Sequence, residues 1–169
     1  MDAKKFYTHL YKLLDDVTPI KADCGKLCGG ACCEGDEETG MYLFPHEEVM
    51  YSGKEKWIKI EDSEFIFRGK PVKIAICTGK CVRHKRPLSC RIFPLFLDNN
   101  GAVVHDKRGN GLCPLVTAKI PLGDFDPEFI GNVKRVFNIL NRFTVTKEYL
   151  AQTRELIEEY DELNNIFEL

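Results

Sequence analysis

The chain has 169 residues, of which 44% are hydrophobic and 30% are charged, and its formal net charge at pH 7 is −2. This length and composition suit one domain with its own hydrophobic core, and the near-neutral charge gives no general attraction to nucleic acid or to anionic membranes. No apolar run approaches the roughly 18–20 residues of a membrane span, and no apolar signal core follows the first residues. We therefore expect a single domain over residues 1–169, located in the cytoplasm, with neither a membrane nor a nucleic acid as partner.

The first part of the chain predicts one helix and one loop. Residues 3–17 place apolar side chains at helical spacing, which is typical of an amphipathic helix with one buried face. This helix should end at Thr18, because the residue before a proline is pushed out of the α conformation. The segment 24–33 contains three glycines, which make a regular helix costly, so we expect a loop or a broken turn there.

The middle of the chain has the pattern of short strands. Pro45 should open a helical turn, since proline is favoured at the first position of a helix. Residues 92–105 predict a β-hairpin whose turn, at 98–101, accepts positive φ angles. Four further segments are apolar or alternate in polarity, as short strands do. These segments are residues 41–44, 57–60, 64–68 and 72–76.

The last third predicts two helices. Asp126 can cap the first, with Pro127 at its first position, and Thr144 begins the second. The acidic residues of the second helix should face water. The expected fold is therefore α+β: an N-terminal helix, a cysteine-rich core over 24–113 with short antiparallel strands and a hairpin, and a helical part over 126–165.

Eight cysteines carry the strongest functional signal of the sequence. Thiolates are soft ligands that hold zinc and iron–sulfur clusters, whereas disulfide frameworks belong mainly to shorter secreted chains. A zinc ion or a [4Fe–4S] cluster takes four ligands, so eight cysteines can supply one site with spares, two sites, or a multinuclear cluster. The candidate metal ligands are Cys24, Cys28, Cys32, Cys33, Cys77, Cys81, Cys90 and Cys113.

The cysteines form two groups along the chain. None of them lies within residues 34–76. We expect the two groups to meet in space and to bind metal together. The adjacent pair Cys32 and Cys33 leaves open whether one of the two is a buried thiol rather than a ligand, since neighbouring side chains point in different directions.

Basic residues crowd the second cysteine group. They fit either a phosphate-binding patch or charge balance, in which cations offset the negative charge of metal-bound thiolates. We favour charge balance because aromatic residues do not interleave with them. Arg86 and Arg91 are therefore our candidates for donors that surround the bound metal group and tune it. His84 is the best placed alternative nitrogen ligand, ahead of His46 and His105.

The cysteine pattern resembles a known family. The block from Arg86 to Pro94 has the sequence Arg-Pro-Leu-Ser-Cys-Arg-Ile-Phe-Pro, and together with the cysteine spacing it is similar to the CxxCxxCC domain family, which is described as chelating zinc or iron. A similar cysteine region occurs in flagellin lysine N-methylases, which are thought to carry an iron–sulfur cluster. Two features depart from the family pattern: the first gap between cysteines is three residues rather than two, and Gly-Gly-Ala precedes the Cys32–Cys33 pair.

Three functions fit these observations. The first is a metal-binding protein that holds zinc or an iron–sulfur cluster. The second is a metal-dependent enzyme, related to protein lysine N-methylation or to redox chemistry, and the third is a structural zinc module with a protein partner. No residues outside the cysteine region form an acid–base or nucleophile arrangement, so the sequence names no protein or small-molecule partner beyond the metal.

Overall fold

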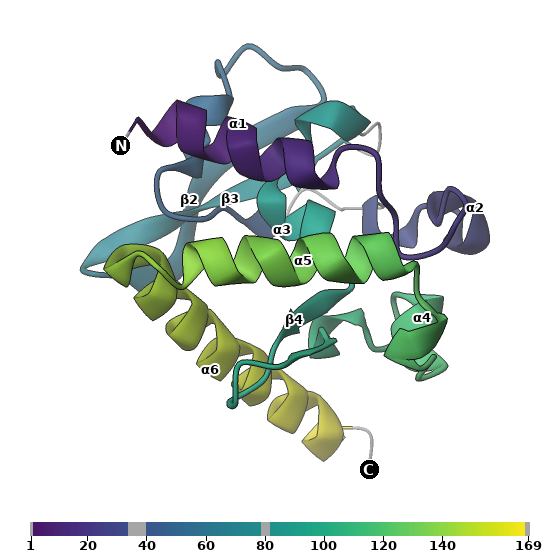
Figure 1. Ribbon diagram of the computed structural model, residues 1–169. Coiled ribbons are helices and arrows are strands. Elements are labelled where there is room, and N and C mark those ends of the chain that lie inside the picture. The colour runs from purple at the N-terminus through teal and green to yellow at the C-terminus, as the bar shows by residue number, and fades with distance from the viewer. Residues whose placement is uncertain (1, 34–39, 79–81, 168–169) are drawn as a thin grey trace.

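The structure is a computed structural model, and it describes residues 2–33, 40–78 and 82–167. It confirms the α+β class, with an N-terminal helix, two small antiparallel sheets and two C-terminal helices (Figure 1). None of the helices in the described ranges combines the length and the apolar composition that a membrane crossing requires.

Helix α1 spans Ala3–Leu14 and ends three residues earlier than predicted. The side chain of Asp2 caps it by accepting a hydrogen bond from the backbone N–H of Lys5 at 3.2 Å. Its buried face includes two tyrosines, which the predicted apolar face did not include. The buried residues are Tyr7, Leu10, Tyr11 and Leu14.

A three-stranded sheet lies behind α1, with the strand order β1–β3–β2 and every pair antiparallel (Figure 1). Its strands are β1 (Met41–Tyr42), β2 (Ile58–Phe67) and β3 (Lys70–Cys77). The two strands predicted at 57–60 and 64–68 are one strand, because an irregularity between Asp62 and Ile66 absorbs the polar residues that suggested a loop.

The predicted hairpin is present, with strands β4 (Leu95–Leu97) and β5 (Val103–His105). Its first strand is shorter than predicted, since Ile92 belongs to helix α3 (Leu88–Ile92). The side chain of Asp98 closes the turn by accepting hydrogen bonds from the backbone N–H groups of Asn100 and Ala102.

Both C-terminal helices are confirmed. Helix α5 spans Pro127–Leu140, and the Asp126 side chain accepts hydrogen bonds from the first backbone N–H groups of the helix. Helix α6 spans Thr144–Phe167.

Short helical segments connect these elements. Helical structure begins at Glu47 rather than at the predicted Pro45, because His46 adopts a left-handed φ of 68° that no regular helix accepts. The short segments are α2 (Gly25–Cys28), η1 (Ala31–Cys33), η2 (Glu47–Met50), η3 (Arg83–Lys85), η4 (Lys107–Gly109), α4 (Pro114–Thr117) and η5 (Leu122–Asp124).

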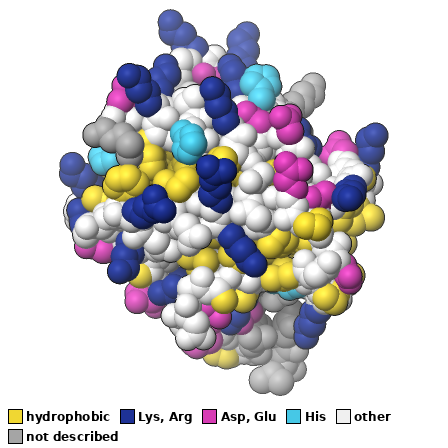
Figure 2. All heavy atoms as spheres, in the orientation of Figure 1, with side chains coloured by type: hydrophobic (Ala, Val, Ile, Leu, Met, Phe, Trp, Pro, Cys, Tyr) yellow, Lys and Arg dark blue, Asp and Glu magenta, His cyan; other side chains and the backbone are white. Residues whose placement is uncertain are grey.

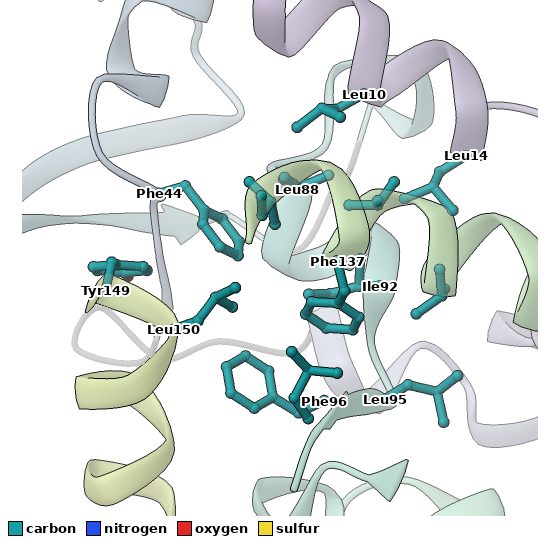
Figure 3. Close-up of a cluster of buried hydrophobic side chains, with 14 of the residues drawn as sticks. Leu10, Leu14, Phe44, Leu88, Ile92, Leu95, Phe96, Phe137, Tyr149 and Leu150 are labelled. Carbon is teal, nitrogen blue, oxygen red and sulfur yellow. The ribbon is translucent and has the colours of Figure 1, made fainter. Parts of the chain in front are cut away.

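Charged side chains of both signs are spread over the face of the molecule that Figure 2 draws. Inside the molecule, one hydrophobic core joins the helices to the hairpin (Figure 3). It packs Leu10 of α1 and Leu88 of α3 against Phe137 of α5, with Phe96 of β4 and Leu150 of α6 beneath them. A smaller cluster contains Leu43, Ile58 of β2 and Ala75 of β3. The core therefore fixes α3, the helix that carries Cys90.

Replacing Phe137 with alanine tests this core. Phe137 is 1% exposed, so we expect the variant to lose about 3–5 kcal/mol of unfolding free energy in chemical denaturation, because a cavity replaces the ring. Phe143→Ala is the matched control: this ring is 40% exposed, and we expect a loss below about 1.5 kcal/mol. Equal losses in both variants would contradict the packing described.

Candidate metal centre

Five cysteines line one cavity of about 50 Å³. This volume is enough for one or two water molecules, and therefore for a metal ion. The cavity lies where α2, α3 and α4 meet the end of α1, and α2 and α4 occupy the same end of the molecule as the start of α5 (Figure 1). The five cysteines are Cys24, Cys28, Cys32, Cys90 and Cys113.

The first cysteine group reaches the cavity because glycines reverse the chain. Cys24 precedes α2 and Cys28 ends it, so both lie on the same turn. Gly29 and Gly30 then adopt left-handed φ angles of 66° and 82°, which glycine accepts without strain. The chain thus turns back and returns Cys32 to the same cavity, as a broken turn rather than a continuous helix.

The buried carboxylate of Glu47 fixes the N-terminus of α3, and with it Cys90. One carboxylate oxygen accepts hydrogen bonds from the Leu88 backbone N–H and the Tyr11 hydroxyl, both at 2.6 Å. The other accepts one from the Phe44 backbone N–H at 2.8 Å. Burial raises the pKa of Glu47 to about 6, although these hydrogen bonds favour the charged form.

Arg91 ties α3 to α1 and to the segment that contains η3. Its guanidinium donates to Asp15 at 2.5 Å and to the backbone carbonyl oxygens of Arg86 and His84 at 2.8 and 2.7 Å. The same group stacks over the Tyr11 ring, 4.1 Å from its centre. The side chain is 3% exposed. Arg91 lines the cavity, and because these partners engage its donors, it positions the cavity wall.

Arg86 and Arg83 also line the cavity, and their charges act on Cys24. Burial raises the pKa of the Cys24 thiol, and the neighbouring Cys32 adds to this effect, while the two arginines oppose it. The pKa of Cys113 is also raised, again chiefly by burial. The cations therefore lie where they can offset thiolate charge, which is the arrangement that the charge-balance interpretation predicts.

The remaining candidate ligands lie elsewhere or outside the described residues. Cys77 ends β3 and packs against the smaller hydrophobic cluster, and it is not among the described residues that line the cavity. Cys81 and the side chain of Cys33 lie outside the described residues. His46 and His84 are exposed, and His105 lines a different cavity beside the hairpin.

The donor set of the cavity suits a soft metal. Sulfur ligands from three separate chain segments, with arginines beside them, match the requirements of zinc or of an iron–sulfur cluster. Within the described ranges, however, no three cysteine, histidine, aspartate or glutamate side chains are already gathered closely enough to hold one ion. Binding would therefore draw the thiols together from the walls of the cavity.

Comparison of the chain with protein-family models, with curated proteins and with solved structures finds no match. The geometry of the cavity therefore carries the assignment of the site. That geometry includes residues that sequence patterns did not single out. Glu47, Tyr11 and Asp15 support the cavity wall, and only their contacts with distant segments reveal this.

The buried carboxylate predicts a pH-dependent difference between the wild type and Glu47→Gln. The ordinary glutamate pKa is 4.5, and the pKa of Glu47 in the folded protein is about 6. At low pH Glu47 is protonated, and burial of the uncharged group does not lower the unfolding free energy. As pH rises through 6 the folded protein must hold a buried charge, so the unfolding free energy falls. Relative to the variant, the wild type should lose about 2 kcal/mol of unfolding free energy between pH 4 and pH 7. Chemical denaturation of both proteins measures this, and a pH-independent difference would contradict it.

Replacing Arg91 with lysine should loosen the cavity wall. A single ammonium group cannot reproduce the contacts to Asp15 and the two carbonyl groups, so we expect a loss on the order of 2–4 kcal/mol in unfolding free energy and faster reaction of the cavity thiols with a thiol reagent. Arg83→Lys is the matched control. The Arg83 side chain is 40% exposed and its contact to Asp23 is 3.6 Å, so a loss below about 1 kcal/mol is expected. Equal effects would show that Arg91 has no special positioning role.

Proposed function

We propose that this protein binds metal, either zinc or an iron–sulfur cluster, through thiolates from both cysteine groups. The observation that supports the proposal is the convergence of five cysteines around one cavity. Cys24, Cys28 and Cys32 come from the first group, and Cys90 and Cys113 come from more than fifty residues further along the chain.

The number and type of ligands favour this function. Four thiolates complete a zinc site or hold a [4Fe–4S] cluster, and the described cavity offers five cysteines. Four thiolates on a divalent ion leave a net charge of about −2, so arginines in the wall stabilise the loaded site. Arg86 contributes its charge directly beside Cys24, and Arg91 holds the segment in which Arg86 lies.

The state of the thiols links metal binding to the fold. Burial keeps Cys24 and Cys113 protonated in the absence of metal, since their pKa values are raised. A metal ion releases such protons when it binds, and the binding free energy then stabilises the arrangement of the segments that carry the ligands. The glycine-rich loop that carries Cys24, Cys28 and Cys32 gains most, because it has few buried side chains of its own.

The resemblance to the CxxCxxCC family supports the same function. The Arg-Pro block of that pattern carries a cysteine, and here the block contains the whole of α3 and lines the cavity. The cytoplasm suits this chemistry, because thiols stay reduced there and remain available to metal.

Metal analysis of cysteine variants tests the proposal. Protein purified anaerobically should contain zinc, or iron with an absorption band near about 400 nm. Cys28→Ser and Cys90→Ser should each lower the bound metal per chain to a small fraction of the wild-type value, because each removes a ligand from the same site. Elemental analysis and the visible spectrum measure both results.

A third variant defines the extent of the site. Cys77→Ser removes a cysteine that lies away from the cavity. Loss of metal from this variant would add Cys77 to the site, and unchanged metal content would show that Cys77 is not a ligand. If Cys28→Ser or Cys90→Ser kept the wild-type metal content, a site shared by the two cysteine groups would be wrong.

A further inference from the structure

The C-terminal end of α6 exposes a row of large apolar side chains. Tyr160, Leu163 and Ile166 are 51%, 55% and 62% exposed, and their spacing of three residues places them along one side of the helix. Earlier in α6, Tyr149 and Ile157 are buried against the core. The helix therefore continues past the body that covers its apolar face, and Figure 1 shows its last turns extending beyond the hairpin.

The same part of α6 is strongly acidic. Five carboxylates lie within one stretch of eight residues, namely Glu155, Glu158, Glu159, Asp161 and Glu162. Lys107 of η4 contacts two of them, Glu158 at 2.5 Å and Asp161 at 3.0 Å. This shows that the acidic side of the helix already accepts a cation from a neighbouring segment.

Large apolar side chains in a row on a helix are a common recognition surface, because a second amphipathic helix can cover them. The negative charge around these apolar side chains determines which kind of helix can bind there. A second copy of this chain would bring its own acidic helix end against this one, and like charges brought together disfavour that contact. A helix with lysines or arginines beside its apolar face would instead meet carboxylates.

We propose that the end of α6, the surface formed by Tyr160, Leu163 and Ile166, docks a basic amphipathic helix of a partner protein. The apolar contacts supply affinity, and the surrounding carboxylates supply orientation and a preference for cationic partners. The surface lies on a different element from the cysteine-lined cavity and does not depend on the metal function.

A designed peptide tests the surface in the full-length protein. The probe is a labelled synthetic peptide of about three heptads, with leucine at the a and d positions and lysine elsewhere, and fluorescence anisotropy measures its binding. The double variant Leu163→Gln and Ile166→Gln should weaken binding at least about tenfold, because glutamine keeps helix propensity and charge but removes the apolar contact. Val49→Gln, which changes another exposed apolar residue, should leave the affinity unchanged.

Charge is tested in the same assay. Replacing Glu159 and Glu162 with glutamine should weaken binding about threefold or more at low salt, and added salt should reduce the difference. The proposal is overturned if the peptide does not bind, if Val49→Gln weakens binding as much as the α6 variant, or if a peptide with glutamate in place of lysine binds equally well. A concentration-dependent dimer of the protein that Leu163→Gln abolishes would also overturn it, in favour of a second copy as the occupant.

Discussion

The carboxylate of Glu47 is buried at the N-terminus of α3, where a phenol from α1 and two backbone N–H groups donate hydrogen bonds to it. A buried charge is tolerated only where its hydrogen-bonding capacity is filled, so this contact sets the distance between α1, the segment before η2, and α3. Near the other end of α3, the hydrogen bond from Arg91 to Asp15 also holds α3 against the end of α1. Cys90 lies between the two anchors, and its position in the cavity wall follows from them.

The cavity has two unlike halves. The α3 half is held by buried polar contacts and by the hydrophobic core. The half that carries Cys24, Cys28 and Cys32 consists of two short helical turns separated by two left-handed glycines. This division fits a site in which one wall is set by folding and the other can adjust to the size and geometry of a metal group. In keeping with this division, the Arg-Pro block forms a helix, whereas the first cysteine group contains glycines with left-handed backbone angles.

Much of the fold could be predicted because its signals are local. The Asp126 cap, the proline after it and the apolar stripe of α5 depend only on neighbours in the chain, and the structure agrees with them. The prediction of two strands in place of β2 was wrong, because the irregularity between Asp62 and Ile66 interrupts the alternation of polar and apolar residues without ending the strand. The convergence of Cys90 and Cys113 with the first group could be expected from cysteine chemistry alone. The separate placement of Cys77 and the roles of Glu47 and Arg91 could not, since they depend on contacts between distant segments.

The cavity is closed by residues from both ends of a long chain segment, from Cys24 to Cys113. Bringing such distant residues together costs more loop-closure entropy than forming contacts between neighbours in the chain. Cys24, Cys28 and Cys32, in contrast, are neighbours in the unfolded chain and meet without that cost. In a newly made chain these three cysteines exist before the second wall does. Under the proposed function, the order in which metal and α3 arrived would therefore determine whether the ion was enclosed or left exposed to competing thiols.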